Sequence, residues 1–248
     1  MEAFFNSYSI YSEQLMYRHW TDSPIGAGFR LAQQALVNLD SSGIVTDGSG
    51  YVTEWANLGA GGSAYDLNTV VGTLANSSVT TLNGIDSVAT TGGYGLEPTT
   101  GQLISSASTV FVVGKFNSAL GAAAQYLFGA KSNNAARNVI LMHGSGLSNQ
   151  WTLFQGDNLF LSETSNANPH VFTGQFNYGA TSALTVSGIG SVTGNGGTES
   201  WDYCTLFADN SGSNNLSGYI SQFIVFDRAL SDSEILSVQS YLASKYAL

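Results

Sequence analysis

The strongest constraint on the fold is an apolar run near the C-terminus, from Ile220 to Phe226. Successive side chains of a strand point to opposite faces, and in this run both alternating sets are largely apolar. A strand of this kind has to be covered on both sides. The run therefore predicts an interior strand between two layers of structure.

The segment after this strand predicts a helix that can form one of those layers. Ser231 is a suitable N-cap, Glu234 completes a capping box, and Asp232 places negative charge at the positive end of the helix. Apolar residues then recur at spacings of three and four and define one helical face: Ile235, Val238, Leu242 and Tyr246. We expect this face to lie on the sheet.

The middle of the chain predicts many short strands. "STVFVVGKF" is apolar on both faces, and further runs are bounded by Gly, Asn or Ser: "QYLFGAK", "RNVILMHG", "WTLFQGDNLFLSE", "HVFTGQFNYG", "ALTVSGIG" and "DYCTLFAD". Asp47-Gly48 lies between two β-branched runs and predicts a hairpin. This spacing favours an antiparallel sandwich or jelly roll. The glycines from Gly59 to Ala64 match a dinucleotide-binding spacing, but no helical pattern follows them, so we interpret the stretch as a loop.

Two separate stretches resemble one protein family. "LSGYISQFIVFDRALSDSEILSVQSYLASKY" is similar to the closing segment of laminin-G-like, concanavalin A-type jelly-roll domains, where a glycine-led strand ends in an Asp-Arg-x-Leu-Ser corner and a terminal helix. "ALVNLDSSGIVTDGSGYVTEWANLGAGGSAYDL" resembles the entry of that fold, with a Trp-x-Asn corner at Trp55 and Asn57. The resemblance covers residues 31–248.

This resemblance implies an all-β fold, an antiparallel two-sheet jelly-roll sandwich with a short C-terminal helix. Domains of this kind and composition look most like those of bacteriophage virion proteins and bacterial surface proteins, which implies attachment or decoration. At the corner, we expect Arg228, next to Asp227, to hold the turn through carbonyl groups or a carboxylate.

Residues 1–30 lie outside the resemblance and form an expected N-terminal arm. The arm is rich in aromatic residues, of which we assign five to docking: Phe4, Phe5, Tyr8, Tyr11 and Trp20. Either the arm packs on its own domain, or it buries these rings in a partner or a neighbouring copy, because such a patch is a liability when exposed. Pro24 and two glycines interrupt its helical spacing, and the pattern of "FRLAQQALVNL" fits either a helix or a strand.

Charge and cysteine content exclude several classes of protein. Seven Lys and Arg residues against seventeen Asp and Glu residues give a formal charge of -10, which disfavours nucleic acid as a partner. The single Cys204 permits no internal disulfide and reads as a small buried residue. No apolar run reaches membrane-spanning length, and no secretory signal is apparent. We expect a virion-surface protein that becomes extracellular by lysis, with no membrane partner.

Glycan binding requires an aromatic face and a few polar groups close to it. Loop-proximal residues of these types are the candidate ligand contacts: Trp151, Trp201, Tyr178, Tyr94, Asn149, Asn177 and Asp202. Glycoside hydrolysis requires two facing carboxyl groups. Glu199 with Asp202 is the nearest such pair, but a separation of three places the two side chains on opposite faces of a strand.

Catalytic and cofactor motifs are weak throughout the sequence. The three histidines, His19, His143 and His170, are isolated and read as satisfied or exposed side chains. We expect no cofactor, with calcium at Asp209–Asn215 as a weaker alternative to a plain turn.

The sequence therefore predicts a non-enzymatic virion-surface structural protein: a capsid decoration protein, a head fibre or a tail attachment module. Its expected partners are other virion proteins or copies of itself, together with host cell-surface glycans. The alternative is a glycoside hydrolase or depolymerase of the concanavalin A-like fold that degrades polysaccharides.

Overall fold

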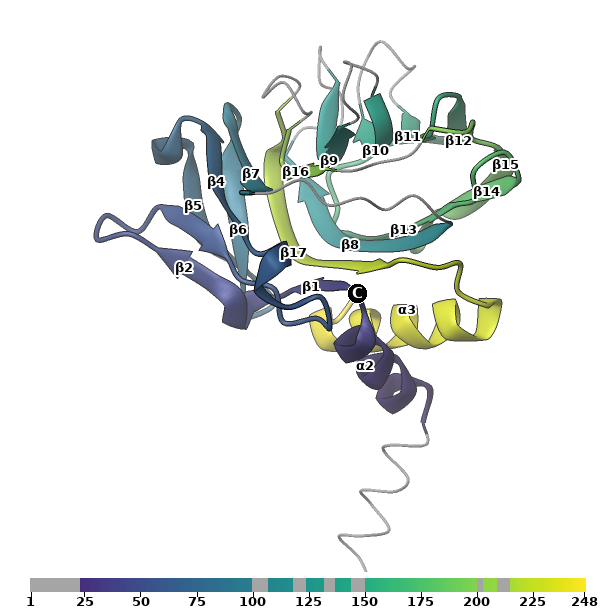
Figure 1. Cartoon of the computed structure of the whole chain (residues 1–248), viewed down its shortest axis with the longest axis horizontal. Coiled ribbons are helices and arrows are strands. Elements are labelled where there is room, and N and C mark those ends of the chain that lie inside the picture. Colours follow the sequence, from purple (N-terminus) through teal and green to yellow (C-terminus); the bar gives the residue numbers. More distant parts are fainter. Residues whose placement is uncertain are drawn as a thin grey trace, which may run out of the picture.

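A computed structural model describes residues 23–99, 107–117, 124–131, 137–143, 150–199, 203–208 and 215–248. Within these residues the chain forms two antiparallel sheets that face each other, with two helices on the outer side of one sheet (Figure 1). The fold is therefore the all-β, two-sheet jelly-roll sandwich with a C-terminal helix that the sequence predicts.

The first sheet, sheet A, has the order β15-β14-β13-β8-β17-β6-β5, and β1 pairs with β17 beside this path. Its strands are β1 (Val37–Leu39), β5 (Ser77–Leu82), β6 (Ile85–Thr91), β8 (Ser108–Phe116), β13 (His170–Phe176), β14 (Thr181–Val186), β15 (Gly190–Asn195) and β17 (Ser217–Phe226).

The second sheet, sheet B, has the order β12-β11-β10-β9-β16-β7-β4-β3-β2. Its strands are β2 (Ile44–Thr46), β3 (Val52–Trp55), β4 (Leu67–Gly72), β7 (Tyr94–Pro98), β9 (Gln125–Lys131), β10 (Arg137–His143), β11 (Gln150–Phe154), β12 (Asn158–Thr164) and β16 (Tyr203–Leu206). Short 3-10 turns occupy Ser41–Gly43, Gly62–Tyr65 and Leu74–Asn76.

The main core lies between the two sheets, and β17 is covered on both faces as its sequence predicts. Val225 and Phe223 face the inter-sheet core, whereas Ile224 and Phe226 face the helices. The strand β8 beside it is buried at all but one of its nine positions. These two strands form the centre of sheet A.

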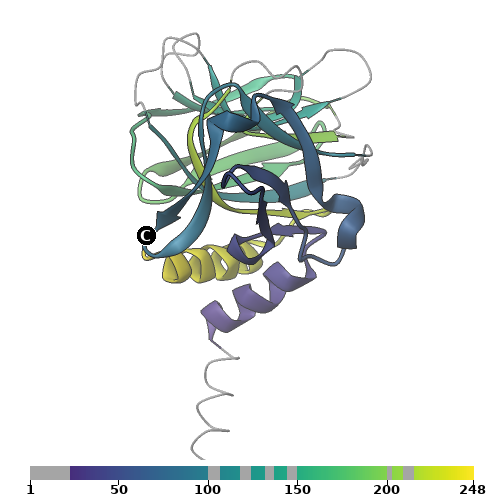
Figure 2. The ribbon, with the colours of Figure 1, turned by 90° about the vertical axis from the view of Figure 1, so that its left-hand side faces the viewer.

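Helix α3 (Asp232–Tyr246) covers the outer face of sheet A, as Figure 2 shows from the side. Ser231 caps it, and both hydrogen bonds of the capping box with Glu234 are present. The predicted apolar face packs on the sheet, with Val238, Leu242 and Tyr246 fully buried and Ile235 partly buried. The sequence-based prediction of this helix and of its buried face is confirmed.

Helix α2 (Pro24–Gln34) packs against α3 and contains both glycines that follow Pro24 in the sequence. Pro24 starts this helix, because proline suits the first helical turn and Ser23 caps it by accepting a hydrogen bond from Gly26 N. Gly28 lies so close to α3 that a Cβ there would meet the carbonyl oxygen of Ser237. The ambiguous "FRLAQQALVNL" divides into the end of α2 and the strand β1, and α2 crosses the boundary drawn at residue 30.

The tightest hairpin is β5–β6, which the sequence analysis missed. Asn83 and Gly84 form its two-residue turn with φ values of 51° and 84°, the left-handed conformation that Asn-Gly adopts readily in such turns. The Asn83 side chain donates a hydrogen bond to the Tyr246 carbonyl and so ties the hairpin to the end of α3. The predicted hairpin at Asp47-Gly48 is also present, between β2 and β3.

Candidate functional site

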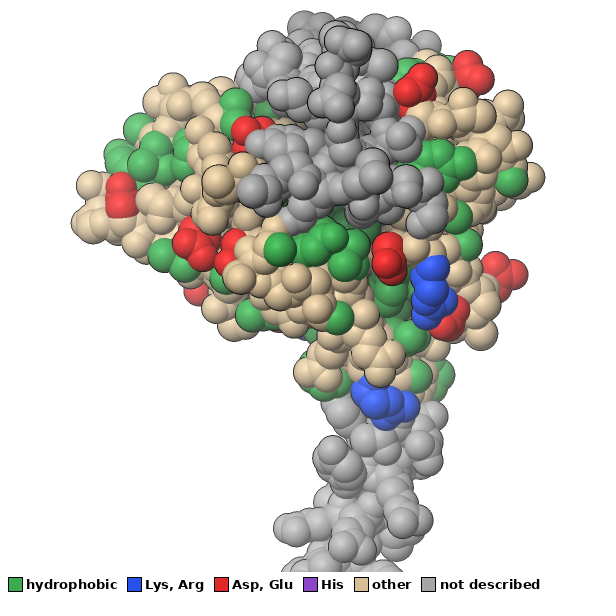
Figure 3. Space-filling view, viewed as in Figure 1, with side chains coloured by type: hydrophobic (Ala, Val, Ile, Leu, Met, Phe, Trp, Pro, Cys, Tyr) green, Lys and Arg blue, Asp and Glu red, His purple; other side chains and the backbone are tan. Residues whose placement is uncertain are grey.

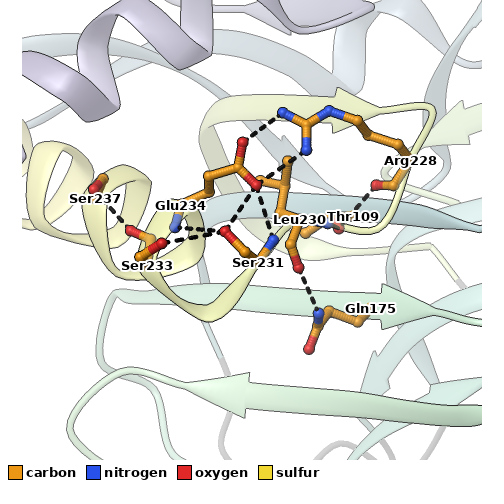
Figure 4. Close-up of polar contacts among 8 residues, drawn as sticks. All are labelled: Thr109, Gln175, Arg228, Leu230, Ser231, Ser233, Glu234 and Ser237. Carbon is orange, nitrogen blue, oxygen red and sulfur yellow. Dashed lines mark hydrogen bonds and ion pairs between the residues drawn. The ribbon is translucent and has the colours of Figure 1, made fainter.

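The corner between β17 and α3 is a closed structural unit (Figure 4). The Arg228 guanidinium makes two hydrogen bonds to the Glu234 carboxylate, at 2.7 and 3.0 Å. Thr109 donates its hydroxyl proton to the Arg228 carbonyl and accepts from Leu230 N, and the Gln175 amide donates to the Leu230 carbonyl. The prediction that Arg228 holds this corner is confirmed, with a carboxylate as its partner.

The second corner, at Trp55 and Asn57, is equally closed. Asn57 Oδ1 accepts from the backbone N–H of Asn38 and Gly59, and its Nδ2 donates to the carbonyl groups of Leu36 and Gly62. Trp55 is fully buried and donates Nε1–H to the Asp40 carbonyl at 2.7 Å. Both residues therefore serve the framework, and the glycine stretch is a loop packed on the chain around Leu36, as predicted.

Two of the predicted ligand contacts are core residues. Trp151 is 2% exposed and packs edge-on against His170 and Phe172, because its position on β11 faces the inter-sheet core. Tyr94 is fully buried and donates its hydroxyl proton to the Val52 carbonyl. The predictions for Trp151 and Tyr94 are corrected accordingly, because no sugar can reach the face of either ring.

Several other predicted residues lie outside the part of the chain that the structure describes. These are Trp201, Asn149 and Asp202 among the ligand contacts, the arm residues Phe4, Phe5, Tyr8, Tyr11 and Trp20, and all of the suggested calcium segment except Asn215.

The remaining two predicted contacts, Asn177 and Tyr178, lie where three turns meet. We call this place the three-turn end and define it as residues 155–157, 177–180 and 196–199. The turns are joined by backbone hydrogen bonds from Gly179 N to the Gly197 carbonyl, from Asp157 N to the Gly196 carbonyl and from Glu199 N to the Gln155 carbonyl. Pairing of β14 with β15 places residues 196–199 beside residues 177–180, and the contact of β12 with β15 brings the β11–β12 turn of sheet B to them.

Side chains brace the three turns from beneath. Asn177 N donates to Ser182 Oγ, which in turn donates to Gln155 Oε1 at 3.1 Å. Asn177 also donates from its side chain to the Thr181 carbonyl. Gln155 is fully buried, and its Nε2 finds no hydrogen-bond partner among the described residues. The end is therefore a rigid platform with one unused amide donor below its surface.

Within the three-turn end, Tyr178 is the one residue other than glycine with a positive φ. Its backbone φ is 25°, a value that residues other than glycine rarely adopt and that costs on the order of 1–3 kcal/mol. Gly156, Gly179 and Gly197 take positive φ values around it at no such cost. The half-buried Tyr178 ring is thus held on the platform against its local preference, a pattern that clusters at ligand sites.

The three turns carry the carboxyl groups of Asp157 and Glu199 and contain no Lys, Arg or His. The three turns thus carry an aromatic ring, carboxylates and amides, the group types that bind a sugar, because a ring contacts the apolar face and polar groups bond hydroxyls. Sequence reasoning missed Gln155 and Asp157, and considered Glu199 only as an acid paired with Asp202. The Gly-Asp step after β11 was the available signal.

Other reactive groups in the described residues are satisfied or inert. His170 is buried with its ring nitrogens close to the Ser187 carbonyl and Asn166 Oδ1, and burial lowers its pKa despite the Ser187 contact. Burial raises the pKa of the Cys204 thiol, with a further contribution from Glu97. Among the described residues, no three His, Cys, Asp or Glu side chains are grouped to hold a metal ion. No helix in this part of the chain is long and apolar enough to span a membrane.

Comparisons with known proteins show the fold alone. No protein-family model and no curated protein matches the chain. A Trypanosoma rangeli sialidase in complex with the inhibitor DANA matches with a TM-score of 0.58 and 14% identity, over 82% of this chain and 32% of that one. The botulinum neurotoxin serotype D ligand binding domain in complex with N-acetylneuraminic acid gives a TM-score of 0.60 and 14% identity, over 86% and 52%. The chain thus spans about half or less of these structures, both of which contain a β-sandwich of the same kind.

Proposed function

We propose that this protein is a non-enzymatic module of a bacteriophage virion surface that binds host glycans at the three-turn end. The observation that carries the proposal is Tyr178, a half-exposed ring held at positive φ on three interlocked turns. Support also comes from two structural neighbours, a toxin ligand binding domain and a sialidase, each bound to a sugar or a sugar-like inhibitor.

The charges at the site favour an uncharged saccharide. Asp157 and Glu199 accept hydrogen bonds from sugar hydroxyls, and the three turns offer no cation for a sugar carboxylate. The chain as a whole carries a formal charge of -10, which repels acidic sugars at longer range. N-acetylneuraminic acid, the ligand of the toxin domain, is an acidic sugar. This protein therefore differs from that neighbour in ligand class.

Binding of the full-length protein to a glycan array, followed by calorimetric titration of the protein with the best ligand, tests this proposal. Tyr178→Ala should weaken binding about five- to a hundredfold, because stacking on one aromatic ring contributes about 1–3 kcal/mol. The matched control is Tyr51→Ala in the β2–β3 turn, which should bind normally. Equal affinity of the Tyr178 variant and the wild type would refute the site.

The competing function is cleavage of the polysaccharide, and the same ligand distinguishes the two. Prolonged incubation with host capsule should leave the chain-length distribution unchanged. Shortening of the polysaccharide that disappears in Glu199→Gln would establish the hydrolase instead.

Attachment to the particle is the second part of the proposal, and residues 1–22 carry it. Their deletion leaves the Ser23 cap and helix α2 intact. The shortened chain should keep its melting temperature and its glycan binding but lose association with particles that lack the protein. Normal docking of the shortened chain would exclude the arm as the anchor.

A further inference from the structure

The sandwich has open sheet edges, and most of them are protected. Strand β2 has three residues and a register shift in its pairing with β3. Strand β12 also has a register shift and carries the charged Glu163. Strand β12 lies close to β15, the edge strand of sheet A at the same end, so these two strands face each other across the end of the sandwich (Figure 1). Short strands, irregular pairing, charges and covering segments are the usual defences against edge-to-edge association.

Strand β5 lacks most of these defences, and its edge is covered only at its first residue, Ser77. It is the terminal strand of sheet A, has six residues, "SSVTTL", and pairs with β6 without a register shift. It contains no charge, proline or glycine. In Figure 2, which turns this flank toward the viewer, β5 and β6 lie at the front of the sandwich. Strand β3 approaches β5 at its first residue, where Val52 N donates to Ser77 Oγ.

The β5–β6 turn determines which groups of β5 point outward. Leu82 and Ile85 flank a two-residue turn and therefore form a hydrogen-bonded pair. Alternate residues along β5 then direct their N–H and C=O groups away from β6, among them Val79 and Thr81. Val79 is 38% exposed, one of the few large apolar side chains on the surface of the described residues.

Charge limits where two copies of this chain can meet. Each copy carries a formal charge of -10, so most pairs of surfaces repel. Figure 3 shows acidic side chains on both flanks of this face of the molecule, and basic ones on its right and lower parts. The edge of β5 itself bears only hydroxyl and apolar side chains. It can therefore approach an identical edge without placing like charges opposite each other.

We propose that β5 pairs with β5 of a second copy, in antiparallel register about a two-fold axis at Val79. This register pairs Val79 with its own copy and sets Ser77 opposite Thr81 and Ser78 opposite Thr80, so every cross-strand pair is uncharged. The two A sheets become one continuous sheet across the dimer. This pairing is independent of glycan binding at the three-turn end.

Sedimentation velocity across a concentration series tests the proposal. The sedimenting species should have twice the 26.0 kDa mass of one chain. Added salt should strengthen the association by screening the negative charges. Val79→Lys should return the protein to monomer mass at every concentration. The matched control, Thr193→Lys on the β15 edge, should remain dimeric.

A wild-type protein that stays monomeric throughout the series would overturn the pairing, and so would a dimer that persists in Val79→Lys. Hydrogen exchange of the wild type gives an answer that does not depend on the variants folding. The Val79 and Thr81 amides should become protected as concentration rises. If the exchange rates of these two amides do not change with protein concentration, the proposal is contradicted.

Discussion

The corner at the start of α3 and the three-turn end differ in how their polar groups are used. At the corner, Arg228 and Glu234 bond each other, and the carbonyl groups of Arg228 and Leu230 are bonded from β8 and β13. At the three-turn end, the backbone is equally well bonded, yet Tyr178 is strained and Gln155 Nε2 has no partner among the described residues.

This difference separates a structural region from the proposed ligand site. Where every group is satisfied internally, a ligand gains nothing by binding, because it has to displace bonds that already exist. Where a rigid frame holds a residue in a strained backbone conformation, the rest of the structure has to offset that strain, and such residues cluster at ligand sites. We therefore expect changes near α3 to alter stability and changes at the three-turn end to alter binding.

The largest effect on stability should come from the buried face of α3. Leu242→Ala should lower the free energy of unfolding by about 2–5 kcal/mol, because it opens a cavity between α3 and sheet A. Urea unfolding measures this loss. The glycan affinity of the folded fraction should be unchanged. A loss of binding free energy as large as the loss of stability would contradict the distinction between the two regions.

The second-largest loss of stability should come from a change at the contact between α2 and α3. Gly28→Ala should cost about 1–3 kcal/mol, because the new methyl group overlaps the Ser237 carbonyl and lies 2.9 Å from Tyr241 Cβ. The control is Gly48→Ala in the β2–β3 turn, where a Cβ meets nothing within 4 Å. If thermal melting shows equal destabilisation by both substitutions, the close helix crossing is not what limits stability.

Acid should weaken the corner by a smaller amount. Hydrogen bonds from Arg228, with help from the Ser231 backbone N–H, lower the pKa of Glu234 to about 2 from an ordinary value of 4.5. Its contribution is therefore complete above pH 4.5 and is lost as the pH falls toward 2. Glu234→Gln keeps a capping side chain but not the charge, so its melting temperature should depend less on pH across this range. Parallel pH profiles of the two proteins would count against the ion pair.

The smallest stability effect should be at Tyr178. Tyr178→Gly removes the strain of a positive φ but makes the unfolded chain more flexible, so the unfolding free energy should stay level or rise by up to about 1 kcal/mol. Glycan binding should nevertheless fall. Chemical denaturation gives the first quantity and calorimetric titration the second. Destabilisation beyond 1 kcal/mol would mean that the ring supports the fold.

Much of the fold could be predicted because its signals are local. The capping box at Ser231, the spacing from Ile235 to Tyr246 and the two-sided apolar runs of β8 and β17 each depend on residues close in sequence. The start of α2 and the Asn83-Gly84 hairpin were also local signals. The sequence-based interpretation takes Pro24 as a break and the longer Asp47-Gly48 loop as the stronger turn, and it therefore misses both.

The candidate site was less predictable, because it depends on contacts distant in sequence. Nothing in the sequence near Asn177 shows that its turn meets residues 155–157 and 196–199, which β14–β15 pairing and contact between the two sheets bring together. Trp151 and Asn177 both lie close to turns in sequence, but only the structure shows that Trp151 points into the core. Residue type alone suggested both Tyr178 and Tyr94, and it could not show that Tyr94 is buried in the core.

Mapping of backbone amide chemical shifts during titration with a neutral oligosaccharide from the glycan array tests the central claim most directly. The account predicts that the shifts that change belong to residues 155–157, 177–180 and 196–199, while the amides of residues 227–246 stay in place. Chemical-shift changes centred on the corner and α3, with unchanged shifts at the three-turn end, would contradict the central claim.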